Sequence, residues 1–564
     1  MQQEKIIESK LCKHCNSKFE ITDKDLEFYN KISPNFNGEI FQITTPTLCP
    51  DCREQRRLSF RNERKLYKRK CDATGKDIIS IYSPDKQYKV YHQDYWWSDK
   101  WNVLNYGKDF DFNRSFFEQF NELLENVPKQ NVIGANNQNS DYCNLTADNK
   151  NCYLIFESSN NEDCLFGHWL QKCNRCTDCN FMHQCELCYE SLDCYDCFNS
   201  KYLFSCKNCS DSYFLEDCIG CKNCFGCANL QDKEFYIFNK PYSKEEYFKK
   251  IEEFSVNNVF KEKFLNLSQN YPKKYLRILN SINCLGNQIE DSKNCIYCNH
   301  AHDAEDCKYG EHVWRNAKKC VDVSTAGRDA EFIFESINCG IGVYNCKYCV
   351  QCWSGSNLTY CIFNNNIHNC FGCVGLHSNE QYCILNKQYT KEQYEELVPK
   401  IIEHMKKTGE WGDFFPSSIS PFGYNETVAN EYFPLLKNEA IEKGFKWSDY
   451  ESPFPKVDKI IPASKLPENI SDIPDDILNR AIECEITKKP FKIINQELEF
   501  YRKHNLPIPK RHPDQRHLDR MKLRNPRKLF DRKCDKCGID IKTTYSPDRS
   551  EIVYCEECYN KEIY

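Results

Sequence analysis

Eight cysteines of the chain stand in four pairs, and two residues separate the members of each pair. The pairs are Cys12/Cys15 with Cys49/Cys52 near one end, and Cys534/Cys537 with Cys555/Cys558 near the other. Two intervening residues let both thiolates of a tight turn reach one ion at about 2.3 Å from each sulfur, and a second pair completes a tetrahedron. We therefore predict one four-cysteine zinc site in each set, or two Zn²⁺ ions per chain.

Four protein ligands leave no open coordination position, so the two sites are expected to be structural rather than catalytic. Zinc binding can supply roughly 10 kcal/mol or more of folding free energy to a small module. An iron–sulfur cluster or redox-active thiols are the alternative uses of the same cysteines.

A different cluster of metal-ligand residue types occurs in the segment NHAHDAEDC. It supplies His300, His302, Asp303 and Glu305. Such a group would hold a metal with an open position and act as a metalloenzyme site. A polar surface turn is the commoner meaning of this composition, so we nominate no catalytic residue and lean away from an enzyme.

Basic residues gather beside both cysteine sets. Residues 53–70 carry nine basic and two acidic side chains, and residues 510–533 carry ten and three. Guanidinium groups suit phosphates because they bond in a fork, and Trp96, Trp97 and Trp101 are candidates to stack on bases. The candidate nucleic-acid contacts are Arg53, Arg56, Arg57, Arg61, Arg64, Lys65, Arg520, Lys522, Arg524, Arg527 and Lys528. The alternatives are a solvated basic face, or a face that docks on the acidic middle of the same chain.

Composition sets the class of protein. The net charge is −6 over 564 residues, so the sequence outside the two basic stretches carries −20. The apolar runs are too short for a membrane span, and the first residues lack the pattern of a secretory signal. We therefore expect a cytoplasmic protein in which the 39 cysteines are metal ligands and buried thiols rather than a disulfide scaffold.

The two ends are copies of one module of about 80 residues. DLEFY (25–29) matches ELEFY (497–501) at an offset of 472, and RNERKLYKRKC (61–71) matches RNPRKLFDRKC (524–534) at an offset of 463. Each copy has room for two metal sites but keeps one. The lost sites are Cys484, Thr487, His512 and Gln515 in the second copy, and Cys71, Thr74, His92 and Tyr95 in the first.

The middle of the chain repeats in threes. All sixteen cysteines from Cys143 to Cys227 share one frame of three, and the other residues in that frame are small or apolar. A helix repeats at 3.6 residues and a strand at 2, so neither explains this period. A narrow β-solenoid does, with every third side chain inward and about 12 residues per coil, interrupted by occasional nine-residue coils. Small, apolar cysteine suits so thin a core, and metal clusters or disulfides inside the column are the alternatives.

A second cysteine-rich stretch follows from Cys295 to Cys373. Cys320 and Cys339 fall out of its frame, so we expect insertions or bulges there. Both stretches end in a capping box that opens a helix, with Ser243/Glu246 and Thr390/Gln393 as the paired residues. These helices would cover the last coil.

The sequence thus predicts a mainly β, multidomain protein with duplicated zinc-ribbon modules flanking two cysteine-rich β-solenoids with capping helices. The expected segments are a zinc-ribbon module at 1–110, a helical linker at 111–140, solenoids at 141–265 and 266–405, an aromatic and proline-rich packing segment at 406–483, and a zinc-ribbon module at 484–564.

Long motifs such as LCPDCREQRRLSFRNERKLYKRK, YWWSDKW and TTYSPDRSEIVYCEECY resemble a group of large cysteine-rich zinc-ribbon proteins of candidate-phyla-radiation bacteria. Members of that group often carry the label CaiB/BaiF, which would imply a CoA transferase of α/β fold. This chain has neither alternating β/α blocks nor a Gly-rich turn. The solenoid is also similar in geometry to insect antifreeze proteins with 12 residues per coil, although the outward Thr-x-Thr ladder is absent.

Three functions are compatible with these features. The first is a non-enzymatic zinc protein that binds structured RNA or the ribosome through its basic patches. The second is a rigid scaffold whose zinc modules bind protein partners, and the third is a metalloenzyme using His300 and His302. No membrane partner or small-molecule substrate is indicated.

Overall fold

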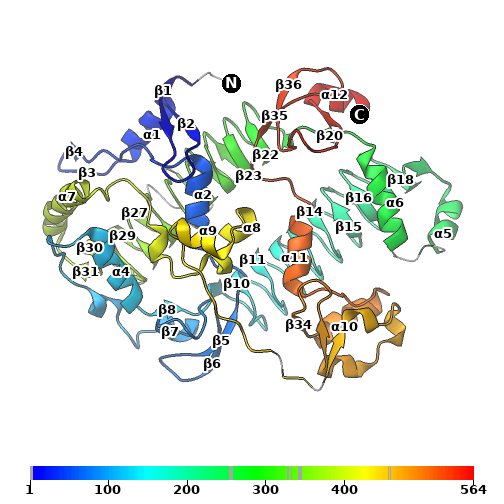
Figure 1. Cartoon of the computed structure of the whole chain (residues 1–564), viewed down its shortest axis with the longest axis horizontal. Helices are drawn as coiled ribbons and strands as arrows, with labels where there is room; N and C mark the ends of the chain where they lie inside the picture. The colour runs from blue at the N-terminus through cyan, green and yellow to red at the C-terminus, as the bar shows by residue number, and fades with distance from the viewer. Residues whose placement is uncertain are drawn as a thin grey trace. The chain divides into compact units, whose positions relative to one another are not determined.

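In the computed structural model the chain forms two compact units, each made of two separate stretches of sequence. The first unit comprises residues 1–131 and 276–450, and the second comprises residues 132–275 and 451–564. The structure describes residues 4–563 apart from 253, 255–257, 327–328, 332, 339, 341–345, 455 and 458. Each unit therefore contains one zinc-ribbon module and one solenoid (Figure 1).

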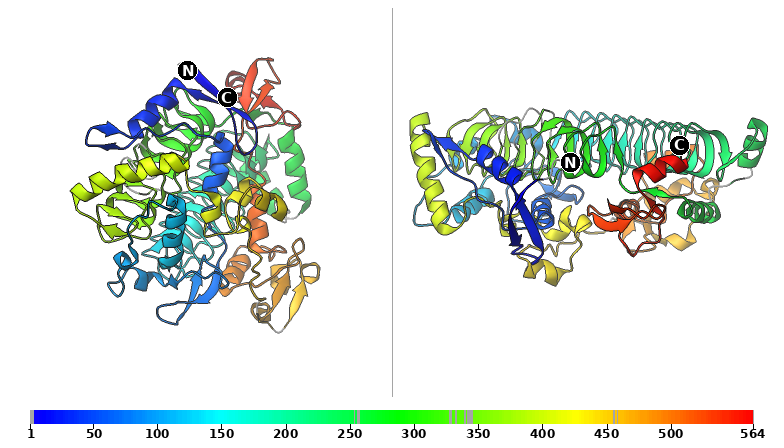
Figure 2. Two further views of the ribbon diagram at one scale, coloured as in Figure 1. Left: turned by 60° about the vertical axis from the view of Figure 1, so that its left-hand side comes forward. Right: turned by 90° about the horizontal axis from the view of Figure 1, so that it is seen from above.

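The solenoid of the second unit is a stack of short parallel strands. The strands are β9 (Gly134–Ala135), β10 (Asn144–Ala147), β11 (Phe156–Ser159), β12 (His168–Gln171), β13 (Asn180–His183), β14 (Leu192–Tyr195), β15 (Lys201–Phe204), β16 (Tyr213–Glu216), β17 (Lys222–Ala228) and β18 (Glu234–Ile237), with β19 (Lys240–Pro241) added antiparallel. Partners along the stack lie twelve residues apart, as in His168↔Asn180. Figure 2 displays these coils edge-on. The twelve-residue coil is confirmed, and the strand pairs described in this stack include none of the expected nine-residue coils.

Every third residue of this solenoid turns a corner in the left-handed conformation. From Leu145 to Phe238 each such residue has φ between +45° and +67°, and half of these positions carry Asn, Asp or Gly. Those residue types have the smallest steric penalty in this region. Each corner immediately precedes an inward position, which explains the strict period of three.

The inward column consists mainly of buried thiols and aliphatic side chains, with buried serines at a few positions. Cys176, for example, donates its Sγ–H to the carbonyls of Asn174 at 3.5 Å and Cys185 at 3.4 Å. Burial holds the pKa of the Cys164 and Cys206 thiols well above the ordinary value. No disulfide joins two cysteines among the described residues, and the side chains of this column pack as one continuous buried ladder.

The solenoid of the first unit follows the same plan less regularly. Its strands are β21 (Ile278–Leu279), β22 (Leu285–Glu290), β23 (Ile296–Glu305), β24 (Glu311–Lys318), β25 (Ser324–Ala326), β26 (Val350–Trp353), β27 (Ser356–Thr359), β28 (Ile362–Asn365), β29 (His368–Phe371), β30 (Cys383–Ile384) and β31 (Lys387–Gln388). Partner spacing changes from twelve at Asn299↔Glu311 to thirteen at Ala304↔Ala317, with a register shift between them. The insertion expected before Cys320 is thereby confirmed, whereas Cys339 lies outside the described residues.

Both predicted capping boxes are present. Ser243 and Glu246 exchange bonds of 3.1 and 3.2 Å ahead of α5 (Lys244–Glu252). Thr390 and Gln393 do the same ahead of α7 (Lys391–Thr408). α6 (Asn258–Gln269) and β20 (Lys273–Lys274) complete the first stretch of the second unit.

The zinc-ribbon module of the first unit begins with a hairpin and two helices. Its elements are β1 (Ile6–Leu11), β2 (Lys18–Thr22), α1 (Asp23–Ile32), β3 (Asn35–Phe36), β4 (Glu39–Ile40), α2 (Pro50–Leu58), β5 (Tyr67–Lys70), β6 (Asp77–Ser80), β7 (Val90–Tyr91), α3 (Gln93–Trp96), η1 (Val103–Tyr106), α4 (Phe116–Asn126) and β8 (Lys129–Gln130).

From β33 onward the module of the second unit repeats the order of β1 to α3, without β3 and β4. Its elements are β32 (Ile460–Pro462), η4 (Ala463–Lys465), η5 (Ile470–Asp472), η6 (Asp475–Asn479), β33 (Ala481–Glu483), β34 (Pro490–Phe491), α10 (Asn495–Lys503), α11 (Pro513–Met521), β35 (Phe530–Lys533), β36 (Asp540–Thr543), β37 (Val553–Tyr554) and α12 (Glu556–Ile563). The bounds of α2 and α11 differ by 463 at both ends, the offset found in the sequence.

The aromatic segment after α7 packs inside the first unit. It contains η2 (Ser417–Ile419), η3 (Tyr424–Glu426), α8 (Ala429–Tyr432) and α9 (Lys437–Glu442). The ring of Phe415 lies 5.3 Å from Phe120 of the module and 5.8 Å from Tyr360 of the solenoid. The segment therefore joins the module to the solenoid in one core.

Candidate metal centres

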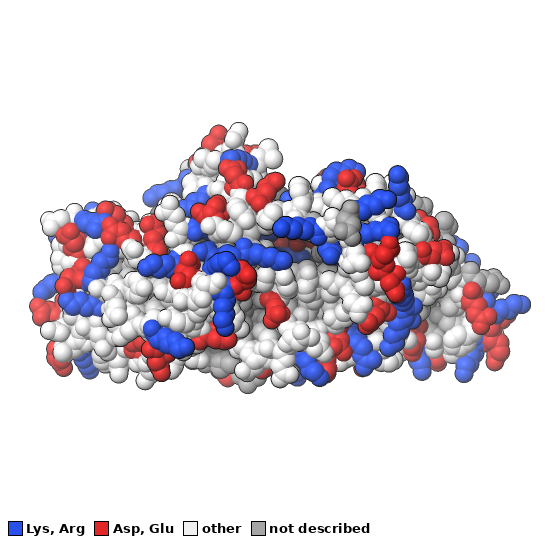
Figure 3. All heavy atoms as spheres, turned by 90° about the horizontal axis from the view of Figure 1, so that it is seen from below, with Lys and Arg blue, Asp and Glu red and all other residues white. Residues whose placement is uncertain are grey.

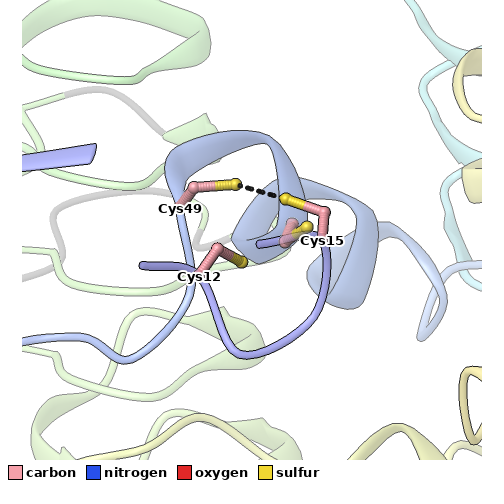
Figure 4. A group of neighbouring side chains, drawn as sticks. Cys12, Cys15 and Cys49 are labelled. Atoms are coloured by element: carbon pink, nitrogen blue, oxygen red, sulfur yellow. Dashed lines mark hydrogen bonds between the residues drawn. The ribbon is translucent and has the colours of Figure 1, made fainter. Parts of the chain in front are cut away.

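The first cysteine set converges as the sequence predicts. Cys12 and Cys15 lie in the turn after β1, Cys49 caps α2, and Cys52 lies in its first turn. All four sulfurs lie within 4.8 Å of one another, and the Sγ atoms of Cys15 and Cys49 are 3.6 Å apart (Figure 4). A tetrahedral ion with sulfur at about 2.3 Å separates its ligands by about 3.8 Å. The geometry thus fits a zinc ion.

The second set forms an equivalent cluster in the other unit. Cys534, Cys537, Cys555 and Cys558 place their sulfurs within 4.8 Å of one another, with 3.8 Å between Cys537 and Cys555. Cys537 is exposed whereas Cys534 is buried. Both four-cysteine groups could therefore hold a metal ion, and their thiolate chemistry is compatible with Zn²⁺.

Hydrogen bonds favour one thiolate in each cluster. The Cys52 side chain lowers the pKa of Cys49 to about 5, and the same interaction raises the pKa of Cys52. Burial raises the pKa of Cys534, but backbone N–H groups led by that of Cys537 lower it to about 6. A bound cation would stabilise the remaining thiolates.

The two lost sites keep the backbone without the ligands. The backbone N–H of Thr487 donates to Cys484 Sγ at 3.5 Å, and that of His92 donates to Cys71 Sγ at 3.3 Å. Neither position belongs to a metal-ligating group among the described residues. Each module therefore keeps one complete four-cysteine group among its described residues.

The arginines beside the first cluster are buried against the solenoid of the same unit. Arg53 and Arg57 of α2 are 2% and 1% exposed, and both pair with Asp322, which is fully buried. The distances to its carboxylate are 2.8 Å from Arg53 Nε and 3.5 Å from Arg57 Nη1. Arg56 donates to both carboxylate oxygens of Glu335 at 2.9 Å. These guanidinium groups face protein rather than solvent.

In the second unit the equivalent helix α11 makes the same arrangement. Arg516 and Arg520 of α11 both pair with Asp178, at 3.0 Å from Arg520. Both arginines are less than 5% exposed, and Asp178 is fully buried. Arg516 also donates to the Tyr501 hydroxyl at 3.1 Å. We call the two sets the arginine clamps: Arg53/Arg57/Asp322 and Arg516/Arg520/Asp178.

A third arginine follows each clamp. Arg61 donates to the Thr325 hydroxyl at 3.1 Å, and Arg524 donates to Asp193 at 3.2 Å. The acceptors Asp178, Asp193 and Asp322 are all corner residues with positive φ. The corners thus supply the acidic groups that receive the modules.

The other candidate nucleic-acid residues differ in exposure. Lys522 and Lys528 are exposed, whereas Arg64, Lys65 and Arg527 are half-buried. Trp96 is buried, and its ring lies 4.3 Å from His377, which Trp97 and Trp101 also contact at 5.4 Å. On the face in Figure 3, basic and acidic side chains are interspersed.

His300 and His302 lie on β23 and do not converge on one ion. The His300 ring contacts His312 at 5.1 Å, while His302 stacks on Trp314 at 5.1 Å. Neither histidine belongs to a metal-ligating group in the part of the chain that the structure describes.

No described helix is both long and apolar enough to cross a membrane.

The clamp acceptors were missed by the sequence interpretation. A signal existed, because Asp178 precedes Cys179 and Asp193 precedes Cys194 by one position, the corner of each triplet. Many corners carry Asp, however, so the pattern does not indicate which of them a module covers.

A scan against protein-family models, a search of curated proteins and a search of solved structures each found no match.

Proposed function

We propose that this protein is a non-enzymatic, zinc-stabilised scaffold in which zinc-ribbon modules brace rigid solenoids that present their outer faces to protein partners. The observation that carries the proposal is the pair of arginine clamps. Guanidinium groups that would otherwise attract phosphates are engaged with buried aspartates of their own unit. In this proposal the remaining surface of each module meets protein partners together with the outer face of its solenoid.

The candidate zinc site supports the proposal because two of its cysteines lie at the start of α2, the helix that carries the clamp arginines. Cys49 and Cys52 would be ligands at the start of this helix, and Arg53 and Arg57 follow them along it. A metal held by Cys12 and Cys15 as well would fix the start of α2, and with it the two guanidinium groups that bond to Asp322. The metal therefore has a mechanical role and takes part in no reaction.

Binding of RNA or of the ribosome is the second candidate. Among the residues nominated for it, Lys522 and Lys528 are exposed. Two isolated lysines give a weak, salt-sensitive attraction, because each phosphate contact contributes separately to the salt dependence of binding.

The test uses the zinc-loaded full chain in two assays. For a scaffold, proteins that copurify with the chain survive nuclease treatment, and an RNA or DNA mobility shift is absent near physiological salt. RNA retention at that salt, lost on Lys522→Glu with Lys528→Glu and accompanied by loss of all copurifying proteins after nuclease, would instead support the nucleic-acid function. Glu substitution of Lys24, an exposed lysine outside both patches, is the matched control.

A further inference from the structure

A third group of cysteines converges inside the solenoid of the first unit. The Sγ atoms of Cys346, Cys349 and Cys352 lie within 4.8 Å of one another, and those of Cys346 and Cys352 are 3.5 Å apart. All three residues are at most 3% exposed. This group is separate from both four-cysteine centres.

The spacing alone does not bring the sulfurs together. CxxCxxC also occurs at residues 173–179 of the other solenoid, and twice with overlap at 218–224 and 221–227. Those cysteines are equally buried, yet they form no group of three ligand atoms within 4.8 Å among the described residues. The three coils therefore provide an internal comparison.

The fourth inward position of the coil distinguishes the three cases. In the two coils of the other solenoid this position holds the buried Met182 and the partly buried Leu230. In the coil of Cys346 it holds Gly355, where a Cβ atom would stand 3.1 Å from Cys352 Sγ and 2.7 Å from Leu358 Cδ1. With no side chain at this inward position, the three thiols can approach one another.

We propose that Cys346, Cys349 and Cys352 form a three-thiolate site for a soft d¹⁰ cation, Cu⁺. Thiolates select soft ions such as Cu⁺ and Zn²⁺. Zn²⁺ in proteins is almost always four-coordinate, and no fourth His, Cys, Asp or Glu ligand joins this group in the described part of the chain. Cu⁺ accepts three thiolates and needs no fourth ligand.

Charge at the site is partly balanced by a neighbouring cation. Lys347 is 3% exposed and interacts electrostatically with Cys346 and Cys349. Three thiolates with one Cu⁺ carry two negative charges, and an isolated buried charge is costly. A buried ammonium group beside the cluster reduces that cost.

The experiment adds one equivalent of Cu⁺, as its acetonitrile complex, to the zinc-loaded full chain without oxygen and with bathocuproine disulfonate as competitor. Native mass spectrometry then counts both metals. We expect wild type to hold one copper in addition to two zinc ions. Cys349→Ser should bind copper at least tenfold more weakly, while the matched control Cys176→Ser should bind it like wild type.

Serine is a suitable substitute because Ser191, Ser200 and Ser212 already occupy inward positions. Copper uptake by Cys349→Ser equal to that of wild type, equal loss in both variants, or uptake only with release of zinc would overturn the proposal. X-ray absorption of the copper-loaded wild type gives an independent reading. Three sulfur ligands are expected, and two sulfurs or a nitrogen ligand would contradict the site.

Discussion

At the scale of single residues, the molecule is distinguished by charges that are buried in complementary sets. Asp322 and Asp178 each receive two arginines in a site without solvent exposure. A buried ion pair adds little net stability over an apolar replacement, but removal of one partner leaves an uncompensated charge. The clamps therefore fix where each helix docks more than they strengthen the fold.

Substitution of Asp322 by Asn tests this account in the first unit. The variant keeps the shape of the side chain but leaves Arg53 and Arg57 without their carboxylate, so we expect a loss of about 3–5 kcal/mol in unfolding free energy. Chemical denaturation followed by tryptophan fluorescence measures it, because seven of the eight tryptophans belong to this unit. Glu27→Gln, in the exposed pair with Lys24, should cost less than about 1 kcal/mol. Equal effects of the two substitutions would argue against a buried clamp.

Glu497 gives the second clamp a pH dependence. Burial raises the pKa of this carboxyl to about 7, although Arg516 opposes the shift. The unfolded value is about 4.3, so the folded state holds a proton that the unfolded state releases between these values. The stabilising contribution of Glu497 is complete below about pH 4.3 and is lost as pH rises through about 7.

Gln at this position cannot titrate. The stability of Glu497→Gln relative to wild type should therefore increase, by on the order of 3 kcal/mol, between about pH 4 and pH 8. Hydrogen exchange of α10 under denaturant, measured on both proteins across this range, reports the difference. A difference that stays constant with pH would show that Glu497 does not titrate as described.

At the scale of elements, α2 and α11 are equivalent helices of the two modules, and they differ in how their first turns are held. α2 starts at a four-cysteine cluster, whereas α11 starts at His512, whose side chain accepts from the backbone N–H of Asp514 at 3.1 Å. In α11 the additional bond between His517 and Asn180, at 3.1 Å, helps to hold the helix on its solenoid. One helix thus starts at a candidate metal centre, and the other starts at a histidine that accepts a hydrogen bond from its first turn.

Removal of zinc should affect amide exchange in α2 but not in α11. After treatment with a chelator, we expect amide exchange in α2 to accelerate at least tenfold, because the ligands Cys49 and Cys52 no longer hold its first turn. Exchange in α11 should change little. Mass spectrometry resolves both peptides in one sample, so α11 serves as the internal control, and equal acceleration in both would contradict a metal-specific role for α2.

The period of three could be predicted from the cysteines because inward positions tolerate few residue types. The twelve-residue coil could be predicted because the segment CFNSKYLFSC (197–206) is followed twelve residues later by the similar segment CSDSYFLEDC (209–218). The partners of the arginines could not be predicted, because Asp178 is one of many corner aspartates with similar sequence surroundings. Asp178 is buried because a module packs over its corner, and this tertiary contact cannot be predicted from the local sequence.

At the scale of the whole molecule, duplication explains why each unit has one four-cysteine group that could hold a metal ion. Both modules keep the turn that follows the first cysteine, with Cys12 N–H bonded to Ser17 O at 2.9 Å and Cys484 N–H bonded to Lys489 O at 3.1 Å. The backbone of the lost site in the second unit therefore still has the form of a zinc knuckle. Its ligands are missing, but its geometry remains.

Restoring those ligands should restore a metal site. The triple variant Thr487→Cys, His512→Cys, Gln515→Cys is expected to bind three zinc ions, and the parent chain two, by elemental analysis. The single variant Thr487→Cys has too few ligands and should stay at two. A triple variant that also stays at two would mean that the equivalence of the modules does not extend to ligand geometry.

The most direct test of the account is the chemical accessibility of individual arginines in the native, zinc-loaded chain. Phenylglyoxal labelling followed by peptide mass spectrometry should leave Arg53, Arg57, Arg516 and Arg520 unmodified while Arg175, which is 46% exposed in its side chain, reacts readily. All five should react after unfolding. If the four clamp arginines were modified in the native protein as fast as Arg175, they would be open to phosphates, and the scaffold braced by internal ion pairs would be contradicted.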